Sequence, residues 1–187
     1  MTKQQQPTKV VTGKVRFSYL HAFEPKSING SDPKYSVSLI IPKADKDTVA
    51  KIERAIETAM KDGETRLWGG KRPANLKVPL RDGDAERPDD EAYKNAYFLN
   101  ANSKQKPGIV DANLNEILDS TELYSGCYGR ASVNFFPFNT NGNKGVGVGW
   151  NNLQLLSQGD PLGGKTRPQD DFEAVGTEDD EDIDFLG

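Results

Sequence analysis

Three side chains on one predicted strand have the chemistry to bind a single-stranded nucleic acid. Residues 130–138 alternate between two faces, which is typical of a half-buried strand. The apolar face holds Ala131, Val133 and Phe135. The other face combines a cation with two rings, Arg130, Phe136 and Phe138. Rings stack on bases and a cation pairs with phosphate, so this face could be a nucleic-acid platform. The alternative is that both rings pack under a loop or a neighbouring strand.

The residues that catalysis would need are scarce. There is one histidine, His21, and no serine lies in a nucleophile elbow. Cys127 could be a reactive thiol, but a small buried apolar residue is the favoured interpretation. Four carboxylates, Asp82, Asp84, Asp89 and Asp90, could hold a divalent metal as in nucleases, although the run around Gly83 looks like a turn. We therefore expect no enzyme, no metal and no cofactor.

A hairpin positions the platform. Residues 139–143, Asn-Thr-Asn-Gly-Asn, tolerate positive φ and predict a turn. The returning strand starts near Lys144 and places Val146, Val148 and Trp150 on its apolar face. Asn151 and Asn152 then predict a bulge before the apolar face resumes.

Two earlier strands are predicted with the same polar and basic outer character. Residues 10–20 place Val11, Val15, Phe17 and Tyr19 on one face and Lys14, Arg16 and Ser18 on the other. Residues 34–41 turn Lys34, Ser36 and Ser38 outward. Five cations are expected to form one strip that follows phosphates and releases counterions: Lys14, Arg16, Lys34, Arg130 and Lys144.

A helix is predicted over residues 46–61, capped by Asp45 and followed by Gly63, with an apolar stripe that packs on the sheet. Residues 63–92 show no period and contain Trp68, Lys71 and Arg72. They could form a basic flap over a polyanion, or a surface loop that Trp68 anchors to the body. A strand over 93–102 makes Tyr97, with Trp68, a secondary stacking candidate. A short strand at 109–111 and one helical turn within 113–125 complete the prediction.

These elements predict a mainly β fold with one helix. About five strands and long loops suit a partly open, five-stranded OB-type barrel, and a β-sandwich with one helix is the competing architecture. The expected organisation is a disordered N-terminus (1–8), an OB-fold domain (9–160, with the flap at 63–92) and a disordered acidic tail (161–187).

Charge divides the chain into two parts. Of its 24 basic and 28 acidic residues, 2 and 10 follow Leu156, which leaves 22 and 18 in a mildly basic body. The tail run holds Asp179, Asp180, Glu181, Asp182, Ile183, Asp184 and Phe185. It could simply solubilise the chain, but its apolar end and its charge sign, which is that of DNA, favour a docking function. A single cysteine, no signal-peptide pattern and no apolar run of membrane-span length predict a cytoplasmic protein.

Six segments, in their order and spacing, carry a family resemblance. They are GKVRFSYLHAFEP, KYSVSLIIPK, PLRDGD, KPGIVDAN, YSGCYGRASVNFFPFN and GVGVGWNNLQLLSQGDPLGG, followed by DDF. From about residue 13 to 172 the chain resembles the OB-fold single-stranded-DNA-binding proteins of tailed bacteriophages. The resemblance implies a replication, recombination or repair accessory that coats single strands without strong sequence preference, in the cytoplasm of an infected bacterium.

Partners are expected from the resemblance and from the acidic tail. Single-stranded DNA is the expected ligand, with duplex DNA bound more weakly. Tails of this kind compete with DNA for the basic groove and dock replication or recombination proteins. A tail could also bridge two grooves in a homodimer. A protein-binding or DNA-mimic module is the alternative, although mimics are usually acidic throughout; a metal-dependent nuclease is the more remote one.

Overall fold

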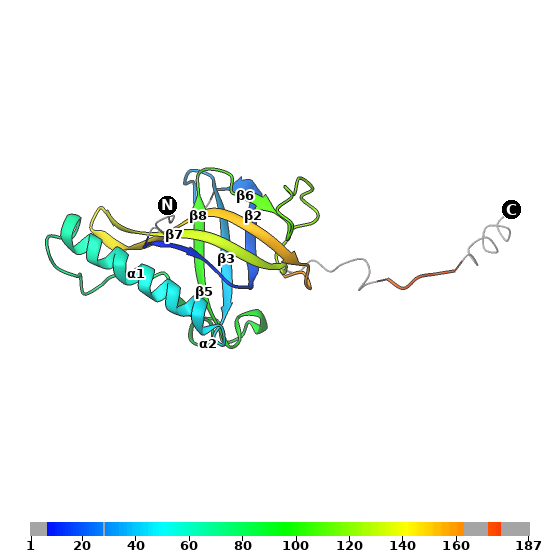
Figure 1. The fold of residues 1–187 in the computed structure, drawn as a ribbon, viewed down its shortest axis with the longest axis horizontal. Helices are drawn as coiled ribbons and strands as arrows, with labels where there is room; N and C mark the ends of the chain where they lie inside the picture. The colour runs from blue at the N-terminus through cyan, green and yellow to red at the C-terminus, as the bar shows by residue number, and fades with distance from the viewer. Residues whose placement is uncertain (1–6, 28, 163–171, 177–187) are drawn as a thin grey trace.

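The computed structural model describes residues 7–27, 29–162 and 172–176 and is mainly β (Figure 1). In chain order its elements are β1 (Lys9–Val11), β2 (Val15–Lys26), β3 (Lys34–Pro42), α1 (Lys46–Arg66), β4 (Arg81–Asp82), α2 (Gly83–Glu86), the 3-10 helix η1 (Glu91–Tyr93), β5 (Ala96–Ser103), β6 (Gly108–Val110), β7 (Tyr128–Thr140) and β8 (Asn143–Ser157). In the part of the chain that the structure describes, no helix is both long and apolar enough to span a membrane.

Five strands form a ring. Their order is β2–β3–β5–β8–β7, and β7 pairs back with β2. Three short strands are added to this ring: β1 pairs with β7, β6 with β8, and β4 with β5. The contact between β5 and β8 is parallel and consists of one register pair, Asn102 with Gly149. We call this contact the seam, because the ring is only partly closed there. A five-stranded, partly open ring is the OB-type architecture, so the mainly β prediction is confirmed.

Helix α1 packs against β7 (Figure 1). It buries the predicted stripe, including Ile52, Ile56 and Ala59. The Asp45 cap is confirmed, since its carboxylate accepts from the Thr48 N–H at 3.2 Å. The predicted end is wrong: the helix continues to Arg66 and includes Gly63. A Cβ at Gly63 would lie 2.7 Å from the Trp68 ring. This glycine therefore permits a close approach inside the helix and does not terminate it.

The first predicted strand is two strands. It breaks at residues 12–14, so that β1 pairs with β7 while β2 pairs with β3 and with β7. A register shift follows Ser18, and it turns Tyr19 out of the apolar face where the sequence placed it. Strand β2 then continues to Lys26, beyond residue 20, where the predicted strand ended. No helical turn forms within 113–125; the Asp111 carboxylate instead accepts from the N–H groups of Asn113 and Asn115.

The β7–β8 hairpin matches the prediction closely. Thr140 pairs with Asn143 across a two-residue turn in which Asn141 and Gly142 have φ of 52° and 85°. The bulge is confirmed, because the register passes from Ser132 with Asn152 to Val133 with Trp150 and leaves Asn151 unpaired.

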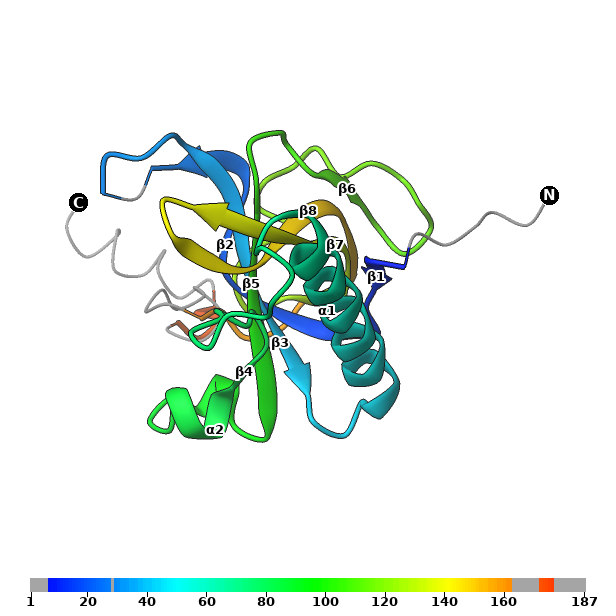
Figure 2. The same cartoon turned by 90° about the vertical axis from the view of Figure 1, so that its left-hand side faces the viewer.

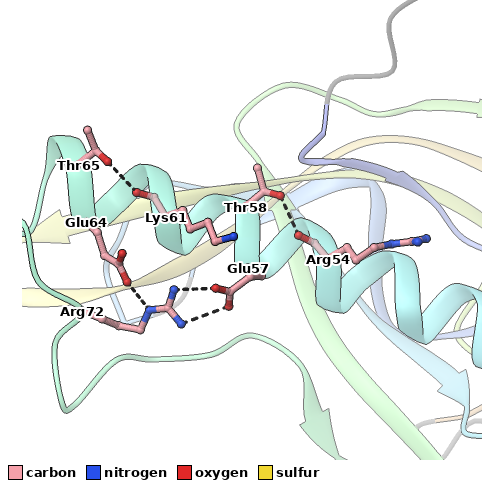
Figure 3. A network of polar contacts seen from close by, with 7 residues as sticks. All are labelled: Arg54, Glu57, Thr58, Lys61, Glu64, Thr65 and Arg72. Carbon is pink, nitrogen blue, oxygen red and sulfur yellow. Dashed lines mark hydrogen bonds and ion pairs between the residues drawn. The ribbon is translucent and has the colours of Figure 1, made fainter.

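The segment 63–92, for which a basic flap or an anchored surface loop was predicted, begins inside α1, and the part that follows the helix is anchored to the body at both ends. Trp68 lies in the main core with an exposed fraction of 5%. Arg72 forms ion pairs with Glu57 and Glu64 of α1 (Figure 3). Further along, Tyr93 packs with Ile40 and Phe98 in a second apolar cluster on the outer side of β3 and β5. We call residues 82–94 the insertion.

Candidate nucleic-acid interface

A row of small polar residues crosses the ring on its outer face. Register pairs join His21 of β2 to Ser36 of β3, Ser36 to Asn102 of β5, Asn102 to Gly149 of β8, and Gly149 to Asn134 of β7. All their strand neighbours except Ser103 belong to the core or pack against it, and alternation along a strand turns these five residues outward. We call this set the transverse row. It crosses the middle strands of the ring, a surface that OB folds use to bind oligonucleotides.

An exposed ring borders one end of the transverse row. Phe136 pairs with Gly147 across β7 and β8, and its exposed fraction is 43%. Three carbons of the ring lie so close to Gly147 that a Cβ there would be 2.6, 2.7 and 3.3 Å from them. The ring therefore lies against the backbone of β8 because that position has no side chain. Phe138, two residues on, is half-buried, and its ring lies against Gly145 in the same way.

Four lysines lie at or next to one end of β2, β3 and β5, the end from which the β2–β3 connection and the loop after β5 rise in Figure 2. Lys26 pairs with Lys34, and Tyr35 pairs with Ser103, the residue before Lys104. Lys106 lies over the Phe23 ring at 5.1 Å. We call Lys26, Lys34, Lys104 and Lys106 the lysine cluster. Among the described residues none of them takes part in an ion pair, so their charge is available to a ligand.

The lysine cluster and the transverse row share one face. Lys34 lies two residues from Ser36, and Lys104 two residues from Asn102, which is one full period along a strand. His21 belongs to the transverse row and feels the charge of Lys26 in the lysine cluster. Burial is the first cause, and the charge of Lys26 the second, that hold the pKa of its imidazole below the usual value. At neutral pH the row is therefore polar and uncharged, with positive charge along one side.

The five cations predicted to form one strip occupy three places. Lys14 and Arg16 lie over the Tyr128 ring at 5.3 and 5.2 Å, and the Arg130 Nε donates to the Thr12 carbonyl at 2.9 Å. Lys34 belongs to the lysine cluster. Lys144 lies at the tip of the β7–β8 hairpin. A single continuous strip is therefore not formed.

The other predicted contacts are placed apart from the transverse row. The Trp68 indole donates to the Phe138 carbonyl at 3.1 Å, which favours the anchoring function considered for it. Lys71, which follows Trp68 in the same segment, is exposed and has no ion pair among the described residues. The Arg72 guanidinium, by contrast, donates to the carboxylates of Glu57 and Glu64 at 2.6–3.2 Å (Figure 3). Tyr97 is half-buried beneath Lys43. The predicted tail contacts, Asp179, Asp180, Glu181, Asp182, Ile183, Asp184 and Phe185, lie outside the described residues.

Several residues of this interface were not predicted from the sequence. Asn100 and Asn102 alternate with the buried Leu99 and Ala101, a pattern that could have identified them. The lysine cluster brings Lys104 and Lys106 beside Lys26 and Lys34 from an earlier part of the chain, which only the sheet register reveals. Tyr19 is exposed because of the register shift in β2, and no local pattern signals that shift.

The groups considered for catalysis are engaged otherwise. Lys43 lies 2.8 Å from both Asp82 and Asp84 and lowers the pKa of each carboxyl through hydrogen bonding. The Cys127 thiol is buried, and burial raises its pKa. Within the described residues no three potential metal ligands come together.

Comparisons with known proteins identify the family and the fold. The family model described as "Enterobacter phage Enc34, ssDNA-binding protein" matches residues 8–186. The single-stranded DNA-binding protein from bacteriophage Enc34, solved in complex with ssDNA, superposes with a TM-score of 0.75 at 22% identity, over 84% of this chain and 91% of that one. The single-stranded DNA-binding protein gp2.5 of bacteriophage T7 superposes with a TM-score of 0.61 at 16% identity, over 90% and 96% of the two chains.

A relative in sequence comes from another phage. Putative protein p50 of Acyrthosiphon pisum secondary endosymbiont phage 1 is 28% identical over 187 residues, which span 94% of this chain and 98% of that protein. The two superpositions show the shared fold, and the family model covers nearly the whole chain. This chain therefore belongs to the family of the single-stranded-DNA-binding protein of Enterobacter phage Enc34.

Proposed function

We propose that this protein binds single-stranded DNA along the transverse row, with Phe136 stacked on a base and phosphates beside the lysine cluster. The observation that carries the proposal is the row itself, which five register-linked positions build across four sheet contacts. Apart from His21, its residues are serine, asparagine and glycine, whose short side chains place few obstacles before an extended strand. An exposed ring and unpaired lysines on the same face supply the two interactions that single-strand binders combine.

This arrangement favours coating over sequence recognition. A ring stacks on any base, and lysines attract any phosphate. A duplex hides its base faces and presents phosphates on a rigid helix, so duplex DNA is expected to bind more weakly. Such a protein would protect single strands during phage replication, recombination or repair in the host cytoplasm.

Direct titration tests the proposal. Fluorescein-labelled oligo(dT) and a matched duplex are titrated at several salt concentrations. Each phosphate contact to a single strand contributes roughly 0.7 to the slope of log K against log salt. Lys34→Ala should lower that slope by about one such contact. Lys51→Ala, which removes an exposed lysine of α1, is the matched control and should leave it unchanged. The absence of oligo(dT) binding at low salt would refute the proposal.

We also propose that the acidic C-terminus competes with DNA for this surface and docks replication or recombination proteins. Leu162 packs against the apolar cluster of Ile40, Tyr93 and Phe98, so the chain reaches residue 162 beside the interface. Removal of residues 163–187 should tighten oligo(dT) binding, most strongly at low salt, because a competing polyanion is lost. An unchanged affinity would refute the competition. If neither form binds DNA, the protein-binding alternative gains support.

A further inference from the structure

Tyr19 has an unusual backbone conformation for an exposed aromatic residue. Its φ is 47° and its exposed fraction is 57%, although it lies within strand β2. Bulky side chains rarely adopt this region, and such strain is concentrated at functional sites. The register shift that creates it lies between Ser18 and His21, so the ring emerges next to the transverse row. Neither burial nor strand pairing explains why a tyrosine occupies this position.

Arg87 of the insertion lies between the Tyr19 ring and two buried rings, Tyr93 and Phe98. The Arg87 guanidinium lies 4.8 Å from the Tyr93 ring, 5.1 Å from the Phe98 ring and 5.4 Å from the Tyr19 ring. Tyr93 and Phe98 are buried, so Arg87 is fixed between a rigid aromatic base and the exposed ring. One face of the Tyr19 ring is therefore supported by Arg87, and a further ring, such as a base, could stack only on the opposite face, from the solvent side.

A cavity of about 210 Å³ opens beside the ring, lined by Ser18, Tyr19, Asp90, Ala92, Ser125 and Leu162. The Asp90 carboxylate accepts from the Ala92 N–H at 3.1 Å. A carboxylate can accept about four hydrogen bonds, so Asp90 retains capacity for a ligand donor. The insertion carries six acidic residues against two basic ones. Lys43 pairs with Asp82 and Asp84, and Arg81 pairs with Glu86. Asp89, Asp90 and Glu91 are therefore the carboxylates without such a pair among the described residues, and this side attracts phosphate less than the lysine cluster does. The lysine cluster lies on the other side.

We propose that this cavity is a nucleobase subsite, in which one base stacks on Tyr19 and presents an exocyclic amino group to Asp90. The inference rests on the proposed single-strand binding and extends it. Phosphates follow the lysine cluster, and the bases turn toward the insertion. Adenine, cytosine and guanine carry such an amino group and thymine does not, so cytosine is favoured over thymine at this position.

The test uses the full chain and two probes, fluorescein-labelled oligo(dC) and oligo(dT). Tyr19→Gly should weaken binding by about 5- to 150-fold, the value of one stacked base. Its thermal stability should be unchanged or raised, because glycine relieves the positive φ. Leu114→Gly is the matched control, since Leu114 has a φ of 67° and an exposed fraction of 72% on the loop after β6. That variant should relieve the same strain and leave affinity unchanged.

The base preference is tested with Asp90→Asn, which keeps an oxygen for the Ala92 N–H. The ratio of oligo(dC) to oligo(dT) affinity should fall by about 2- to 10-fold, the value of one hydrogen bond. An unchanged ratio overturns the assignment of Asp90. If Phe136→Ala weakens binding and Tyr19→Gly does not, the subsite is refuted while single-strand binding stands. If the unaltered chain binds neither probe, the proposed function itself fails.

Discussion

A substitution at Gly147 tests whether the absence of a side chain there allows the Phe136 ring to lie against β8. An added Cβ would lie 2.6 Å from the nearest ring carbon, whereas optimal carbon contacts are about 3.5 Å, so the ring must move by roughly 1 Å. Gly149 lies on the same face of the same strand, and a Cβ there would meet nothing closer than 3.7 Å. Gly147→Ala should therefore displace the ring, and Gly149→Ala should not.

The size of the effect follows from the position of the ring. Stacking of one base is worth roughly 1–3 kcal/mol, and Gly147→Ala should lose a large part of what Phe136→Ala loses. Stability should change little, by about 1 kcal/mol or less. The ring is partly exposed and can swing into solvent, and alanine lowers the entropy of the unfolded chain. Loss of affinity without loss of stability is the expected signature.

A double-mutant cycle measures this coupling. Oligo(dT) affinity and thermal unfolding are compared for Phe136→Ala, Gly147→Ala and the double variant. Gly149→Ala, whose position belongs to the transverse row, is the control for thermal unfolding alone. In the Phe136→Ala background no ring remains to be displaced, so Gly147→Ala should have no further effect on affinity. If it weakens binding equally in both backgrounds, the glycine makes room for the DNA itself, and the reasoning about the ring is wrong.

Three further outcomes are expected. Because the pKa of His21 is lowered in the folded protein, the unfolded state binds a proton more readily. Stability should therefore fall as the pH drops from 7 through 6.5 and below. The variant His21→Gln should flatten that part of the profile of Tm against pH. Trp68→Ala should cost about 3–5 kcal/mol of stability in urea unfolding, because it empties a core position, whereas a surface function for Trp68 predicts a small loss. The Cys127 thiol should react with a thiol reagent only upon unfolding, and rapid reaction of the native protein would contradict its burial.

Local patterns predicted the elements whose two faces differ in polarity. Alternation identified β3 and the β7–β8 hairpin, and the turn residues identified the connection at Asn141 and Gly142, because each signal lies within a few residues. The end of α1 was misplaced since a glycine near a helix end usually terminates it. Here the reason for Gly63 is the Trp68 ring, a contact that becomes visible only in three dimensions.

The candidate site was harder to predict because it depends on sheet register. Ser36, Asn102 and Gly149 are far apart in the chain, and only strand pairing brings them into one row. Tyr19 shows a second limit. Its parity with Phe17 predicted burial, but one register shift reverses the face of every residue that follows.

The seam gives the protein a mechanical property. Between β5 and β8 the ring is held by a single register pair, so this is where it can open at the least free-energy cost. The transverse row runs directly across that pair. A DNA strand lying along the row would therefore hold β5 and β8 together at the seam. It would slow amide hydrogen exchange in β5 and in the adjoining part of β8 more than in the ladder between β7 and the rest of β8, which is already continuous. The ligand would then complete the closure that the polypeptide leaves unfinished.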